Sequence, residues 1–186
     1  MKIVFLKRVA IVIIAAVTVS VSAVAQTASE DDFGKGTMVF SLGLGLGSTM
    51  YGTGYGMKVP PLSASFEFCI LDNLFKNTGK GAIGIAPTIG YASYGWGGWG
   101  FSDVMVGAKG NFHYQFIPKL DTYAGLHIGY EVVKWDSGDY LTGSAGSGIY
   151  EAFLVGGRYY FTNNLAGWAE LGYGVSVLNI GIAVKF

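Results

Sequence analysis

Cysteine, proline and charge are all scarce in this sequence. Its 186 residues include one cysteine, Cys69, and four prolines, and 13% of the residues are charged. A single cysteine excludes an internal disulfide, and it equally excludes a Cys-x-x-Cys metal or redox motif. The chain is therefore neither a disulfide-stapled scaffold nor a zinc-ribbon type of protein.

Long apolar runs are also nearly absent, although 51% of the residues are hydrophobic. The one such run covers residues 9–24, follows the basic residues Lys2, Lys7 and Arg8, and ends in Ala23-Val24-Ala25. It is shorter than the ~20 residues of a membrane-spanning helix. A basic start, an apolar middle and an A-x-A exit predict a cleaved secretory signal peptide over residues 1–25 rather than a retained membrane anchor.

Cleavage after Ala25 would leave 161 of the 186 residues, enough for one domain. Loss of three of the 12 basic residues leaves nine against 12 acidic ones, a net charge near −3. This balance argues against nucleic-acid binding, which needs a clustered basic face.

Glycine and aromatic residues are abundant, at 30 glycines and 15% aromatics. Interior glycine destabilises a helix by about 1 kcal/mol relative to alanine. Apolar residues instead alternate with small or polar ones, which is the period of a β-strand. Eight segments show this alternation: 38–46, 62–70, 83–91, 104–114, 124–132, 153–161, 168–173 and 178–186.

Most of these segments approach the 9–11 residues with which a tilted strand crosses a membrane. Because an open sheet edge would leave backbone groups unpaired in lipid, the sheet must close. The sequence therefore predicts an all-β protein, a closed eight-stranded antiparallel up-and-down transmembrane β-barrel over residues 36–186, after a short periplasmic leader at 26–35. A soluble barrel for an apolar ligand would need the more apolar face inside, the opposite of what the alternation indicates.

Two positions disturb the pattern. Pro87 interrupts the third segment and predicts a bulge, since proline removes a ladder hydrogen bond. Leu154 is a large apolar residue on an inward position, which indicates a local bulge or a shift in phase. Connections alternate between short turns at 115–119 and 162–164 and longer loops at 48–60 and 134–148, which we assign to the periplasm and the cell exterior respectively.

Charged residues occupy inward positions: Glu67, Lys109, Glu131, Arg158, Glu170 and Lys185. They could form an ion path or an active site. An eight-stranded barrel, however, is only wide enough for its own side chains, and buried charges must be paired. Three acids against three bases therefore favour an interior charge network that plugs the barrel. Within it we predict that Arg158 pairs with Glu170 across the hairpin.

The two histidines, His113 and His127, raise the question of an enzyme. A serine nucleophile needs a base and an orienting acid within hydrogen-bond reach, and neither histidine has a serine nearby in a recognisable motif. Two histidines and one cysteine also give little support for a metal site. We therefore predict no catalytic, cofactor-binding or metal-binding residues.

Aromatic residues gather at both expected ends of the barrel. We expect the second external loop to contain Tyr91, Tyr94, Trp96 and Trp99. Their rings would form an interfacial girdle, which is the more common arrangement. The alternative is contact with a glycan or a partner protein, through Tyr94, Trp96, Trp99 and the later Trp135. The opposite girdle would comprise Phe66, Phe68, Phe112, Tyr114, Tyr159, Phe161 and Phe186.

The C-terminus carries apolar residues at every second position and a terminal phenylalanine: Leu178, Ile180, Ile182, Val184 and Phe186. This pattern resembles the signal by which outer-membrane proteins reach the barrel-assembly machinery. The preceding stretches 157–161 and 169–174 are similar to the small OmpA-like and OmpX-like barrels of the porin family. The resemblance implies the bacterial outer membrane as location, and outer-membrane lipid, the assembly machinery and periplasmic chaperones as partners.

Together these observations predict a non-enzymatic integral outer-membrane barrel, structural or surface-exposed, with a plugged polar core. The alternatives are a narrow diffusion channel and, after it, a lipid-modifying outer-membrane enzyme.

Overall fold

The computed structural model describes residues 33–47, 56–75, 81–96, 99–136, 146–172 and 176–186. The predicted signal peptide at 1–25 and the leader as far as residue 32 lie outside the described residues. Within the described ranges there is no helix long and apolar enough to cross a membrane.

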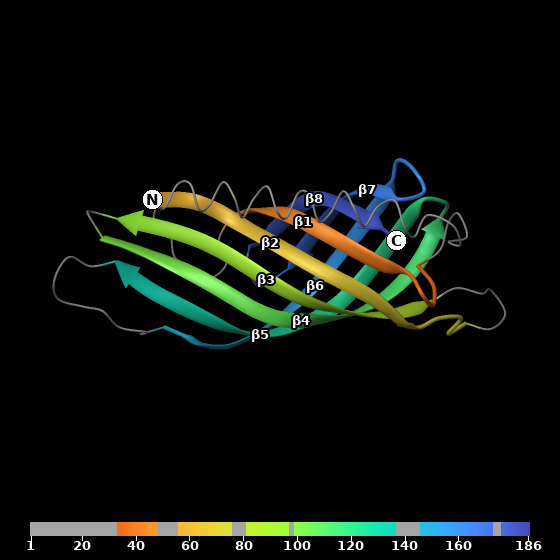
Figure 1. Ribbon diagram of the computed structural model, residues 1–186, viewed down its shortest axis with the longest axis horizontal. Coiled ribbons are helices and arrows are strands. Elements are labelled where there is room, and N and C mark those ends of the chain that lie inside the picture. The colour runs from red at the N-terminus through yellow and green to blue at the C-terminus, as the bar shows by residue number, and fades with distance from the viewer. Residues whose placement is uncertain (1–32, 48–55, 76–80, 97–98, 137–145, 173–175) are drawn as a thin grey trace. The chain divides into compact units, whose positions relative to one another are not determined.

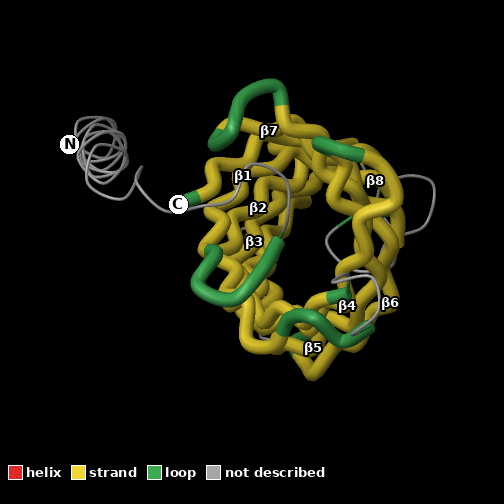
Figure 2. The backbone as a smooth tube through the Cα atoms, turned by 90° about the vertical axis from the view of Figure 1, so that its right-hand side faces the viewer, coloured by secondary structure: helices red, strands yellow, loops and turns green. Residues whose placement is uncertain are grey.

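Eight antiparallel strands form one closed sheet, as the alternating pattern predicted. Each strand pairs with its neighbours in sequence, and β1 closes the ring by pairing with β8 (Figures 1 and 2). The strands are β1 (Met38–Leu46), β2 (Gly56–Leu71), β3 (Ala82–Trp96), β4 (Trp99–Ile117), β5 (Leu120–Asp136), β6 (Gly148–Tyr160), β7 (Leu165–Gly172) and β8 (Leu178–Lys185).

The alternation of residue types sets which face each side chain occupies. In β1, Val39 and Ser41 are buried, whereas Leu42 and Leu44 are 41% and 49% exposed. Large apolar side chains point outward in the other strands as well. More than half of the residue surface is exposed for Val106, Leu126, Ile128 and Ile182. Apolar surface in water costs about 25 cal/mol per Å², so an outward face of this composition belongs in hydrocarbon.

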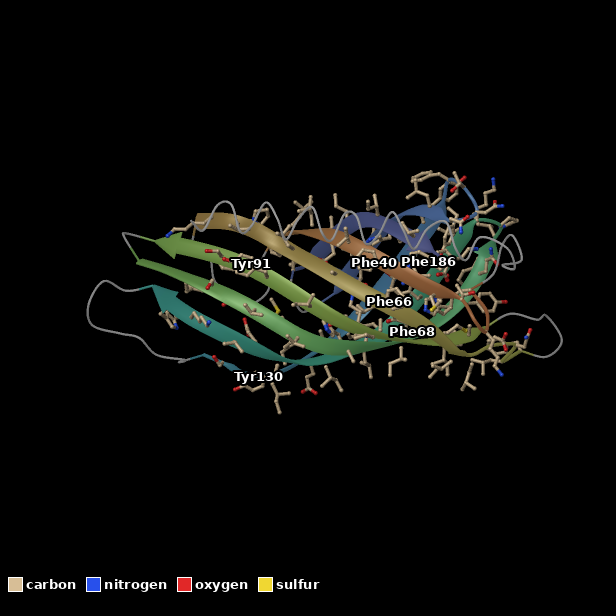
Figure 3. The ribbon with its side chains drawn as sticks, in the orientation of Figure 1. Phe40, Phe66, Phe68, Tyr91, Tyr130 and Phe186 are labelled. Carbon is tan, nitrogen blue, oxygen red and sulfur yellow. The ribbon has the colours of Figure 1, made fainter. Side chains whose placement is uncertain are left out.

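Aromatic side chains form two bands on this outward face. Tyr91 and Tyr130 lie towards one end of the barrel, and Phe40, Phe66 and Phe68 lie towards the other (Figure 3). The Phe66 and Phe68 rings meet edge to face at 4.8 Å, and those of Tyr159 and Phe161 at 5.8 Å. This is the arrangement of interfacial girdles in membrane barrels.

The strands differ strongly in length. Strands β2 to β6 have 13 to 19 residues, whereas β1, β7 and β8 have eight or nine. Because β7 ends at Gly172, opposite Leu154, all pairings of the first residues of β6 in the described part of the chain are with β5. The five long strands therefore project at one end (Figure 1). The connections after β1 and β5, at this end, span nine and eleven residues, whereas at the opposite end the one after β2 spans ten and those after β4 and β6 span two and four. The longer loops favour the cell exterior for this end.

The predicted second external loop is largely strand. β3 continues to Trp96 and β4 begins at Trp99, and these two residues are backbone partners at the tip of a long hairpin. The loop prediction for Tyr91 and Tyr94 was wrong because the alternation there is hidden by interleaved glycines.

Neither predicted irregularity is present. The β2–β3 register is the same on both sides of Pro87, and Pro87 itself pairs with Ala108. Proline at this outward position removes one ladder hydrogen bond without inserting a residue. The register shifts instead fall between Met57 and Leu62, a stretch that contains Pro60 and Pro61, and near Cys69.

Leu154 points into the barrel without a bulge and without a change of phase. It is 2% exposed, and its register partners are Gly125 in β5 and Gly172 in β7. Gly172 leaves space beside this large inward side chain, because a Cβ atom there would lie 3.0 Å from Leu154 Cβ.

Candidate functional site in the barrel interior

Large inward side chains lie against glycines of the neighbouring strands. A Cβ atom at Gly84 would lie 2.6 Å from Glu67 Oε1, and one at Gly43 would lie 2.5 Å from Trp168 Cζ2. A Cβ atom at Gly129 would lie 2.6 Å from Tyr150 Oη, and one at Gly156 would lie 2.6 Å from Tyr123 Cζ. Since real Cβ atoms do not approach this closely, the inward glycines make room for the large interior groups.

Four strands build a buried charge cluster near the periplasmic end. The periplasmic cluster consists of Glu67 from β2, Asn111 and His113 from β4, Asp121 from β5 and Arg158 from β6, and all five residues are at most 3% exposed. The Arg158 guanidinium forms ion pairs with Glu67 and Asp121. Asn111 Nδ2 donates to Glu67 Oε1 at 2.6 Å. Buried charges are tolerated when they are paired and hydrogen-bonded in this way.

His113 completes the periplasmic cluster. Its Nε2 lies 2.9 Å from Glu67 Oε1, and its Nδ1 lies 2.9 Å from Asp121 Oδ1. Carboxylate oxygens only accept hydrogen bonds, so a proton on each ring nitrogen satisfies both contacts. The periplasmic cluster then holds two positive and two negative groups.

A second ion pair crosses the middle of the barrel. Lys109 Nζ in β4 lies 2.7 and 2.8 Å from the two carboxylate oxygens of Glu170 in β7. Tyr123 Oη donates to the same carboxylate at 3.2 Å. Because β4 and β7 are not neighbours in the sheet, this central pair spans the interior.

The predicted pair of Arg158 and Glu170 was wrong. In the β6–β7 register, Arg158 lies opposite Trp168, and Glu170 lies opposite Gly156. The two charged residues are thus two positions apart, and each has other partners. The error came from the turn, whose exact length sets the register of the whole hairpin.

The sequence interpretation included Glu67 and Arg158 but missed the other three members of the periplasmic cluster, Asn111, His113 and Asp121. Asp121 and Arg158 are direct register partners on β5 and β6. The inward alternation of β5 begins at Asp121, before the segment predicted at 124–132, and extending that period backwards would have found it. His113 was treated as an isolated polar residue because its carboxylate neighbours come from other strands.

The other two charges of the predicted network are also buried. Lys185 is 3% exposed, with its Nζ 4.7 Å from the centre of the Tyr160 ring, a cation–π contact. Glu131 is 5% exposed in β5, towards the exterior. All six residues of the predicted network therefore face the interior, at different heights along it.

His127 lies on the exterior side of the central pair. Its Nε2 is 2.7 Å from Thr88 Oγ1 and 2.8 Å from Tyr150 Oη. A void of about 20 Å³ lies beside it, and a second of about 10 Å³ lies towards the periplasmic cluster; Lys109 and Glu170 line both. Voids of this size hold a water molecule or so each.

A group of packed aromatic rings lies inside the barrel at the exterior end. The ring centres of Tyr94 and Phe101 are 5.2 Å apart, and those of Phe101 and Trp135 are 4.9 Å apart. Tyr94 is 3% exposed, so the prediction that it contacts surface ligands was wrong: the extended β3 turns its side chain inward. The side chains of Trp96 and Trp99 lie outside the described residues.

Across the described ranges, no three histidine, cysteine, aspartate or glutamate side chains are arranged to hold a metal ion.

No protein-family model and no curated protein matches this sequence. Among solved structures, the chain is similar to Ail, the attachment invasion locus protein of Yersinia pestis, in complex with the heparin analogue sucrose octasulfate. The TM-score is 0.54 at 10% identity, over 81% of this chain and 97% of Ail.

The fold is that of a small outer-membrane β-barrel. The N-terminal β-barrel domain of Pseudomonas aeruginosa OprF also matches, with a TM-score of 0.48 and 14% identity over 82% of this chain and 99% of that one. The OmpA-like barrel fold that stretches 157–161 and 169–174 predicted is confirmed by the closed ring of eight strands and by the likeness to Ail.

Proposed function

We propose that this chain is a non-enzymatic integral protein of the outer membrane whose interior is closed by its own side chains. The observation that carries the proposal is the central pair. Lys109 and Glu170 reach each other across the barrel, and the periplasmic cluster fills the section beneath them. The two voids that Lys109 and Glu170 line are sized for single waters.

The same small voids argue against an enzyme. A pocket for a small-molecule substrate typically measures ~300–1,000 Å³, far more than the space beside His127. The ring nitrogens of His113 face the carboxylates of Glu67 and Asp121, so neither points at a hydroxyl that it could activate. This arrangement supports a structural role for His113. His127 does contact two hydroxyls, of Thr88 and Tyr150, but the small void beside it leaves no room for a substrate.

Two surfaces remain for function. The outward apolar belt fits outer-membrane lipid as the main partner, and the β8 pattern ending in Phe186 fits recognition by the assembly machinery and its periplasmic chaperones. The projecting part of β2 to β6 presents the chain at the cell surface (Figure 1). A structural or surface-exposed role follows from these two surfaces.

A narrow diffusion channel is the second candidate. It is favoured by one observation, the two polar voids in line on either side of the central pair. In this alternative, the two voids would become one continuous path when Lys109 separates from Glu170.

Planar-bilayer recording of the purified, refolded protein tests the proposal. We expect no steady ohmic conductance from the wild type and a measurable leak from the double variant Lys109→Ala, Glu170→Ala, in which both arms of the central pair are gone. Lys134→Ala, which removes an exposed lysine from β5, is the control and should stay silent. Reproducible steady channels from the wild type would replace the proposed function with the channel.

A further inference from the structure

The residues just before β1 turn back into the periplasmic mouth of the barrel. Phe33 is 8% exposed, although it belongs to no strand. The turn that follows it is closed by Thr37 N donating to Gly34 O at 2.9 Å, with Gly36 at a φ of 91°. Such a φ is readily adopted only by glycine, so the sequence favours this turn.

Phe33 covers the periplasmic cluster. Its ring stacks on the His113 ring at 4.0 Å with an interplanar angle of 25°, and Arg158 Cζ lies 5.8 Å from its centre. Phe33 also belongs to one buried group with Val39, Cys69 and Tyr160. A side chain from the predicted leader thus packs over the periplasmic cluster.

This segment is attached less firmly than a strand. Among the described residues, its backbone links to the barrel are Lys35 N to Asp72 Oδ2, at 2.9 Å and exposed, and Cys69 N to Thr37 O, at 3.1 Å. A strand of the barrel, by contrast, is hydrogen-bonded along both sides. Segments with few buried contacts and exposed hydrogen bonds open at a lower free energy than the whole fold.

We propose that residues 33–37 form a detachable cap, which closes the periplasmic mouth through Phe33 and can lift while the barrel stays folded. This rests on the proposed function and deepens it, because the cap decides whether the periplasmic cluster is sealed from the periplasm. Lifting the cap exposes Arg158 and His113 without disturbing the central pair, so the barrel opens at one end and remains closed across the middle.

Cys69 provides a built-in reporter, since it is the sole cysteine and is 9% exposed within the group that Phe33 completes. The experiment measures the rate at which a small methanethiosulfonate reagent labels Cys69 in the refolded full chain. We expect slow labelling in the wild type and a rate roughly tenfold or more higher in Phe33→Ala, the factor for loss of a stacked aromatic contact. Phe116→Ala, which removes a ring that is 68% exposed at the same end, should match the wild type.

A second measurement needs no variant. Labelling of wild-type Cys69 is followed in rising urea beside the compact gel band of the folded barrel. The cap predicts that labelling accelerates at urea concentrations where the compact band is still intact.

Three results would overturn the cap: equal rates in Phe33→Ala and wild type, equal acceleration by Phe116→Ala, or labelling that rises only at the urea midpoint of the barrel itself. These outcomes are independent of conductance, so the cap and the closed interior can fail separately.

Discussion

Trp168 donates its indole N–H across the seam that closes the barrel, to Leu42 O of β1 at 3.2 Å and to Ile182 O of β8 at 3.1 Å. Leu42 and Ile182 are direct register partners in that seam. The indole comes from β7 and reaches β1 over Gly43 and Gly181, whose missing side chains leave its path free. One side chain thus connects the last two strands of the chain to the first.

Replacing this indole should loosen the seam. Trp168→Phe keeps an aromatic ring but removes the shared donor, and a hydrogen bond of this kind contributes about 0.5–1.5 kcal/mol. We expect a lower urea midpoint and faster hydrogen exchange in β1 and β8, with β3 to β5 little changed. Exchange that rises equally in all strands would mean that Trp168 contributes general packing rather than a link across the seam.

The inward glycines predict a contrast between two identical substitutions. Gly43→Ala places a Cβ 2.5 Å from the Trp168 ring, whereas the outward Gly110→Ala meets nothing within 4 Å. Overpacking of this kind typically costs ~1–3 kcal/mol. Urea unfolding should show a clear loss for Gly43→Ala and almost none for Gly110→Ala, and similar midpoints would contradict the packing argument.

The ion pairs predict a pattern of coupling. Removing one partner of a buried pair costs on the order of 3–5 kcal/mol, because the other charge is left uncompensated. Lys109→Leu and Glu170→Leu should each lower the urea midpoint, and the double variant should recover part of the loss. Arg158→Leu combined with Glu170→Leu should show weaker coupling, since these residues share no ion pair. Strong recovery in that second cycle, matching the first, would contradict the observed pairing.

The terminal pattern predicts a difference between cells and detergent. Deletion of Phe186 should reduce the amount of barrel in the outer membrane, because the terminal residue of β8 is part of the proposed assembly signal. Refolding of the purified variant in detergent should be nearly unaffected, since Phe186 follows the last ladder residue. Wild-type membrane levels of the truncated chain would show that the machinery reads another feature.

Sequence periodicity predicted the fold well because each strand of a membrane barrel carries its own signal. Leu42, Leu44 and Leu46 point outward whatever the rest of the chain does. Partner choice inside the barrel is different, since it depends on register. The β6–β7 turn places Glu170 opposite Gly156 rather than Arg158, and no local pattern specifies that shift.

Contacts across the interior could not be predicted from the sequence for another reason. Glu67, His113 and Arg158 come from three strands and meet only because the sheet curves into a ring. The ends of β3 and β4 were also not predicted. Glycines interrupt the alternation of apolar and polar residues around Tyr94, so the sequence does not indicate which face its side chain occupies. The position of Phe33 depends on a turn outside the alternating pattern altogether.

The unequal strand lengths have a consequence for the membrane itself. At ~3.3 Å per residue and a tilt of roughly 40°, the eight-residue strands β7 and β8 rise only about 20 Å. The usual apolar band of such barrels is ~25 Å tall. Lipid beside these strands must shorten its hydrocarbon layer to match, while lipid beside β4 need not. The protein therefore imposes a gradient of bilayer thickness around its circumference, with the thinnest membrane at the seam where the first and last strands meet.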